Sequence, residues 1–130
     1  MKYVSLFLLT IMTCGCNRPS DVAVKRAETT GVPISIQSSL TRIMDNGEKN
    51  AGLAESEWAE LETLVQSKDE KVRLESVTAL AGISAKRTKQ GERIVKFLQA
   101  RESDSSEDVR DRAELIKKFH LDERAKGAMK

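Results

Sequence analysis

The side chains best suited to catalysis or metal binding are few in this chain, and they do not cluster. There is one histidine, His120, and there are two cysteines, Cys14 and Cys16. Zinc sites and nucleophilic dyads need several such groups at characteristic spacings. The sequence has no helical histidine pair, no nucleophile-elbow motif and no glycine-rich phosphate loop. We therefore expect no enzymatic activity, no metal and no cofactor, and we interpret His120 as a polar group near a helix end.

The first sixteen residues contain the clearest chemical signal. Lys2 is followed by an apolar run over residues 3–12 and then by Thr13-Cys14-Gly15-Cys16. This run is too short to span a bilayer, which needs about 20 apolar residues, but it suits an export signal. The segment resembles the signal peptide of a bacterial lipoprotein. Cys16 is then the lipid-bearing residue because the small Gly15 precedes it, with Cys14 as the competing position.

This resemblance implies a place of action. The mature chain would be held by lipid on Cys16 to a membrane of the bacterial cell envelope, facing the periplasm or the exterior. Each acyl chain contributes about 0.8 kcal/mol per buried methylene, and several chains together anchor stably. Cleavage before Cys16 removes Cys14, so no disulfide or thiolate metal site would remain. The alternatives are an ordinary secreted protein and an apolar N-terminal helix of a cytosolic fold.

The composition indicates one small, charge-balanced domain after the signal. The chain has 22 basic and 20 acidic residues, so no strong field attracts nucleic acid or a membrane surface. Aromatic residues make up 4% of the chain, which limits the core to a modest size. Residues 17–32 are polar and contain Pro19 and Gly31, so we expect a flexible tether there. A short helix over residues 21–29 is the alternative.

From Pro33 onward the apolar residues follow helical spacing. We expect a helical domain over residues 33–120 and a polar tail over 121–130. The expected helices cover about 34–45, 55–66, 68–83, 88–101 and 106–119. Asn46-Gly47 is expected to end the first helix, while Ser67 with Glu70 and Ser105 with Asp108 are expected to cap the third and fifth.

A short motif occurs twice in this helical region. Asp69-Glu-Lys-Val72-Arg73 recurs as Ser106-Glu-Asp-Val109-Arg110, and the two valines lie 37 residues apart. The motif and the residues after it resemble a HEAT repeat, in the short bacterial form that also occurs in phycobilisome-lyase-like proteins. The matching positions are Val72, Arg73, Ala79, Leu80, Val109, Arg110 and Ala113. Ser76 holds a further small-residue position, Gly82 comes one residue late, and Lys117 stands where the family has leucine.

The resemblance implies an all-α fold, either a short HEAT-like α-solenoid or a compact right-handed bundle of about five helices. Five helices make two hairpins and one extra helix, which is near the lower limit for such stacks. The arginines Arg73 and Arg110 are expected to bond the acidic turn of a neighbouring repeat, which is a structural role. The family also includes bilin lyases, but this chain has no thiol or histidine pair for that chemistry.

One charged pattern suggests an interaction surface. Lys86, Lys89, Arg93 and Lys96 are spaced to form a basic stripe on the fourth expected helix, opposite its apolar face. In HEAT-like stacks the second helix of each pair lines the concave surface. The stripe would then meet an acidic partner or lipid headgroups, although an ordinary solvated face is the simpler explanation. Trp58 is expected in the core, and if exposed it would anchor an interface.

These observations give one leading interpretation. The chain is expected to be a lipid-anchored envelope lipoprotein whose small helical-repeat surface binds an unidentified protein, with no nucleic acid and no metal. The alternatives are a structural or accessory envelope lipoprotein without a ligand groove, or a lyase-type enzyme accessory.

Overall fold

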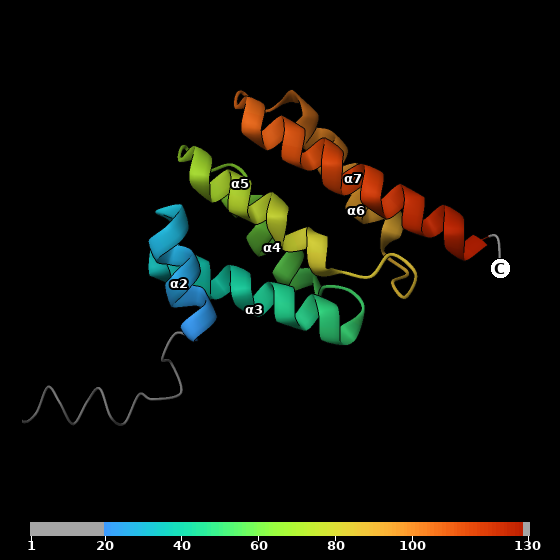
Figure 1. Ribbon diagram of the computed structural model, residues 1–130, viewed down its shortest axis with the longest axis horizontal. Helices are drawn as coiled ribbons and strands as arrows, with labels where there is room; N and C mark the ends of the chain where they lie inside the picture. The colour runs from blue at the N-terminus through green and yellow to red at the C-terminus, as the bar shows by residue number, and fades with distance from the viewer. Residues whose placement is uncertain (1–19, 129–130) are drawn as a thin grey trace, which may run out of the picture.

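The structure is a computed structural model that describes residues 20–128, with side chains up to residue 126. Within this range the chain is all-helical and contains no strand (Figure 1). The α-helices are α2 (Asp21–Thr30), α3 (Ile34–Asn50), α4 (Glu55–Leu64), α5 (Glu70–Thr78), α6 (Gly91–Ala100) and α7 (Glu107–Ala128). Two 3-10 turns, η2 (Ala79–Gly82) and η3 (Arg101–Ser103), extend α5 and α6. None of the described helices is both long and apolar enough to cross a membrane.

The helices form two layers. Helices α3, α5 and α7 lie side by side and run in the same direction, while α4 and α6 lie behind them (Figure 1). Contacts link α3 to η2, α5 to α7 and α6 to α7, and α2 packs against α3 at the N-terminal end. Each front helix from α3 onward is therefore followed by a back helix, except α7, which ends the described chain.

One apolar core joins the two layers. Its fully buried side chains come from both of them: Leu40 and Ile43 of α3, Trp58 and Leu61 of α4, Val77 of α5, Leu80 of η2, Ile94 and Leu98 of α6, and Val109 and Ala113 of α7. Trp58 is 1% exposed, which confirms its predicted place in the core. Burying each large side chain contributes roughly 1.5–3 kcal/mol, so the spacing of these residues is what makes the helices pack.

The segment expected to be a flexible tether forms a helix in its described part. Ser20 caps α2 by accepting a hydrogen bond from the Ala23 amide, and Gly31 ends it in the left-handed conformation. Ala23 and Val32 are buried, and Arg26 forms an ion pair with Glu75 of α5 at 2.5 Å. These contacts stabilise α2 in spite of its polar sequence. Residues 21–30 therefore form a short helix, which was the alternative to the predicted tether.

Helix α3 continues beyond the expected stop at Asn46-Gly47. It ends at Asn50, where Ala51 takes the left-handed conformation. Gly47 lies inside the helix and is buried. A Cβ there would stand 3.0 Å from Ile83 Cγ1 and from Leu53 Cδ2, so glycine is what lets these two side chains pack so closely against α3. The glycine serves close packing, and the prediction that it ends the helix was wrong.

The caps of α5 and α7 also differ from the expected ones. Asp69 caps α5 by accepting from the Lys71 amide, and Ser67 accepts from the Asp69 amide instead of forming a capping box with Glu70. At α7, Ser106 accepts from the Val109 amide, one residue later than predicted. In both places a serine or aspartate oxygen satisfies a free amide at the helix start, but the partners are shifted.

The expected polar tail over residues 121–130 is helical as far as Ala128. The last part of α7 is held to the body by Glu123, which lies 3.6 Å from Lys86, and by Arg124, which packs against Gly91 of α6. His120 is fully buried, and one of its ring nitrogens lies 3.0 Å from the Leu80 carbonyl oxygen. The histidine is a packing residue of α7 and not a helix-end group.

Candidate functional site

A groove runs between the two back-layer helices, α4 and α6. It has a volume of about 310 Å³ and is lined by Trp58, Glu62, Val65, Gln66, Arg93, Lys96, Phe97, Ala100 and Arg101. Along α4 and the turn after it, the lining residues from Trp58 to Gln66 are spaced at i, i+4, i+7 and i+8. Along α6 and the start of η3, those from Arg93 to Arg101 are spaced at i, i+3, i+4, i+7 and i+8. Each helix therefore presents one face to the groove.

Aromatic and basic side chains form the floor and walls of this groove. The Trp58 and Phe97 rings lie 5.8 Å apart between centroids at a tilted angle. The Arg93 guanidinium stands 4.6 Å above the Trp58 ring, and that of Arg101 stands 5.3 Å from the Phe97 ring. A cation over an aromatic face is stabilised by about 0.5–1 kcal/mol at exposed sites. These contacts hold both guanidinium groups over the rings while they remain charged.

Arg93 is also paired with a carboxylate outside the groove. Its two terminal nitrogens donate to the two Glu55 oxygens at 2.6 and 3.0 Å. This bidentate hydrogen bonding by Arg93 holds the pKa of Glu55 below its usual value, and the same bonds raise the pKa of Arg93. In contrast, Lys96 and Arg101 form no ion pair with the described residues, so they carry the groove's uncompensated positive charge opposite Glu62.

Gln90 fixes the relative position of the groove's two helices. Its side-chain oxygen accepts from the Leu53 amide at 2.8 Å and from the Trp58 indole at 3.3 Å, and its nitrogen donates to the Leu53 carbonyl. Gly52 allows this approach, because a Cβ there would lie 2.9 Å from Gln90 Oε1 and its φ is 153°. Gln90, the residue directly before α6, is thereby hydrogen-bonded to Leu53 in the turn before α4.

The structure does not place the four predicted basic residues on one helix. Helix α6 begins at Gly91, so Lys86 and Lys89 lie in the preceding loop, and only Arg93 and Lys96 lie on the helix. Lys86 faces Glu123 of α7, and Lys89 borders a separate hollow beside the turn before α4. The continuous basic stripe was a wrong prediction, because the loop residues 84–90 follow turns and not the helical spacing.

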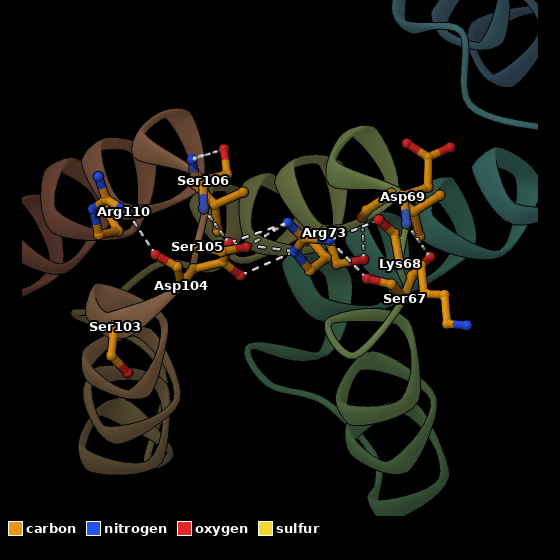
Figure 2. Close-up of polar contacts among 12 residues, drawn as sticks. Ser67, Lys68, Asp69, Arg73, Ser103, Asp104, Ser105, Ser106 and Arg110 are labelled. Atoms are coloured by element: carbon orange, nitrogen blue, oxygen red, sulfur yellow. Dashed lines mark hydrogen bonds and ion pairs between the residues drawn. The ribbon is translucent and has the colours of Figure 1, made fainter.

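The two repeat arginines occupy equivalent positions, which Figure 2 shows. Arg73 donates to the Ser67 carbonyl at 2.8 Å, and Arg110 donates to the Asp104 carbonyl at 2.7 Å, six residues back in each case. Arg73 also binds the Asp104 carboxylate at 3.0 Å, so it joins the turn before α5 to the turn before α7. This contact is the structural role expected for Arg73. Arg110 has no following turn to bind within the described residues.

The other repeat residues form matching buried positions. Val72 and Val109 are both buried, as are Ser76 and Ala113. Ala79 and Leu80 of η2 lie against α3, and the Leu80 carbonyl oxygen also meets His120 of α7. Lys117, at the position equivalent to Leu80, pairs with Glu102 of η3 instead of entering a core.

The remaining candidate positions give no second site within the described residues. Cys16, Cys14 and the rest of the segment expected to be a signal peptide lie outside the described range. Between residues 20 and 126 no histidine, cysteine or carboxylate group of three is arranged to hold a metal ion.

Sequence reasoning missed Glu62, Phe97 and Arg101 as groove residues. They follow Trp58 and Arg93 at helical spacing, so reading the second and fourth expected helices as facing partners would have found them. Comparisons of the chain with family models, with curated proteins and with solved structures gave no match.

Proposed function

We propose that this chain is a bacterial envelope lipoprotein, anchored by lipid on Cys16, whose HEAT-like helical body binds a protein partner in the α4–α6 groove. The groove is the observation that supports binding. It combines the partly exposed Phe97 ring with the charges of Lys96 and Arg101, and among the lining residues only Glu62 opposes them.

The chemistry of the groove favours an acidic partner segment. Aromatic and arginine side chains are enriched among the residues that dominate interface energies. Here Phe97 offers partly exposed ring surface, and the cations beside it suit carboxylates of the partner. Because Lys96 is exposed and Arg101 is half-buried, solvent ions reach both charges and binding should weaken at high salt. The partner would be a protein, since the balanced overall charge gives no preference for nucleic acid.

The HEAT-like assignment rests on the two arginine motifs and the alternation of front and back helices. The anchor rests on the sequence alone, and it is the part that a processing experiment tests directly. Inhibiting lipoprotein signal peptidase in growing cells should accumulate a larger precursor. A chain whose size does not respond would remove the anchor from the proposal.

Binding is tested with a charge reversal and a matched control. The variant Lys96→Glu with Arg101→Glu reverses the free charges of the groove, while Lys118→Glu reverses one exposed charge on α7. Partner recovery after cross-linking in intact envelopes should be lost in the first variant and retained in the second. Equal recovery from both would contradict a groove-based interaction. Trp58 is the chain's one tryptophan, so its fluorescence should also respond to partner binding.

A further inference from the structure

Helix α7 carries a second exposed surface, away from the α4–α6 groove. Leu115 is 64% exposed and Phe119 is 52% exposed, which is unusual for two large apolar side chains one turn apart. Leu115 borders a hollow of about 360 Å³ between α5 and α7, together with Leu74, Asp108, Asp111 and Arg112. The front layer therefore has an apolar strip beside a shallow groove.

This strip belongs to a longer heptad-like stripe along α7. Its members are Asp108, Arg112, Leu115, Phe119, Asp122 and Lys126, separated by steps of 4, 3, 4, 3 and 4 residues. Such alternation keeps side chains on one face of a helix and is the spacing by which two helices pack along a seam. The members other than the half-buried Arg112 are all exposed.

The order of charges along the stripe is self-complementary. When a second α7 is laid antiparallel with Leu115 facing Phe119, Arg112 faces Asp122 and Asp108 faces Lys126. Each of these facing pairs has residue numbers that add to the same sum, so one two-fold axis relates all of them. A symmetric dimer interface uses the same patch on both subunits in this way.

We propose that two copies of this chain associate through an antiparallel α7–α7 contact along this stripe. The contact between Leu115 of one copy and Phe119 of the other occurs twice at the centre of the interface. The Arg112–Asp122 and Asp108–Lys126 pairs also occur twice each, so four ion pairs surround this apolar centre. Arg112 retains its hydrogen bond to Thr78 of its own chain at 2.9 Å, which holds its head group at the edge of the stripe. Lys126 lies 3.9 Å from Glu123 in an exposed contact, so it can exchange that partner for Asp108.

The proposal is tested by sedimentation of the full chain in detergent micelles. The unmodified chain should be dimeric, and Leu115→Glu should be monomeric because it places two unpaired carboxylates, one from each copy, against the Phe119 rings at the centre. Leu121→Glu is the matched control. Leu121 is a similarly exposed leucine of α7, but it lies two residues beyond Phe119 and so about 200° around the helix.

A charge swap tests the antiparallel register. Asp108→Lys should raise the dimer dissociation constant roughly three- to ten-fold, because symmetry makes the lost pair occur twice. Adding Lys126→Asp to that variant should restore the original constant. The proposal is overturned by a monomeric unmodified chain, by a Leu121→Glu chain that dissociates as fully as Leu115→Glu, or by a double variant no tighter than Asp108→Lys.

Discussion

The two copies of the repeat, residues 67–83 and 104–120, share their backbone chemistry but differ in what lies beside them. In both, an arginine bonds the carbonyl of the first residue, six positions back, and both bury a valine and a small residue on the same face. The first copy lies between neighbours on two sides. Its Val77 and Leu80 are fully buried, whereas Glu114 and Lys117 stand at the equivalent positions of the second copy and face solvent or η3.

This difference explains the mismatch seen in the sequence. A residue that is apolar in an internal repeat needs to be polar in a terminal one, because no further repeat covers it. We therefore interpret Lys117 in place of leucine as an end-cap residue of the described helices. Within residues 20–128, α7 is the last helix of the front layer.

Exchanging the differing residues should have the largest effect. Leu80→Lys buries an unpaired charge between α3 and α7, so it should cost at least as much as a leucine-to-alanine change in a core, about 2–5 kcal/mol. The reverse change, Lys117→Leu, should alter the free energy of unfolding by about 1 kcal/mol or less, since it removes one partly exposed ion pair. Urea denaturation measures both values, and similar costs would contradict the end-cap interpretation.

The two arginines should differ by a smaller amount. Arg73→Met removes a nearly buried ion pair with Asp104 and two carbonyl bonds, and should cost about 2–3 kcal/mol. Arg110→Met removes one carbonyl bond and should cost about 1 kcal/mol. A double-mutant cycle of Arg73→Met with Asp104→Asn isolates the link between repeats. No coupling in that cycle would mean that the two turns are independent.

The ends of the two copies give the next comparison. The first copy turns into a 3-10 segment at Ala79 and ends at Gly82, whose equivalent in the second copy is Phe119 within a continuous helix. A Cβ at Gly82 would meet nothing within 4 Å, so Gly82→Ala should be neutral or stabilise by about 0.4–1 kcal/mol. Gly47→Ala serves as the contrast and should destabilise by about 1–3 kcal/mol through crowding of Ile83 and Leu53. The melting temperature should fall for Gly47→Ala, and for Gly82→Ala it should rise or stay unchanged.

The smallest expected effect concerns the pair outside the groove. The pKa of Glu55 is lowered by its hydrogen bonds to Arg93, so the pair contributes stability above the ordinary pKa of glutamate and loses it as the pH falls through the lowered value. Glu55→Gln should remove that pH dependence and leave the fold unchanged, because the carboxylate is solvent-exposed. It should also free Arg93 and strengthen binding of an acidic partner at neutral pH. Weaker binding by this variant would contradict an acidic partner.

The sequence predicted the helices and their buried faces better than it predicted their ends. Helical apolar spacing indicated the buried side chains of α3, α4 and α6, because burial of those side chains decides the packing. In α7 it held for Val109, Ala113 and Ile116, whereas Leu115 and Phe119, apolar at the same spacing, are exposed. Helix ends depend on tertiary contacts that no local pattern records: Gly47 continues α3 because it packs against Ile83, and α2 forms because Arg26 reaches Glu75 across the layer.

The groove was only partly predictable. Trp58 and Lys96 were identified for their type and spacing, yet the stripe through Lys86 and Lys89 assumed a helix where the chain forms a loop. The pairing of Arg93 with Glu55 joins residues 38 positions apart, and only the fold brings them together. The interpretation of Cys16 depends on chemical processing and not on the described structure.

A photo-activated cross-linking residue at position 96, compared with one at position 118, tests the functional account most directly. In living cells we expect position 96 to capture one discrete envelope protein and position 118 not to capture it, and we expect Cys16→Ser to reduce the capture by removing the proposed anchor. Capture of the same protein from both positions, or of none from position 96, would contradict a partner held in the α4–α6 groove.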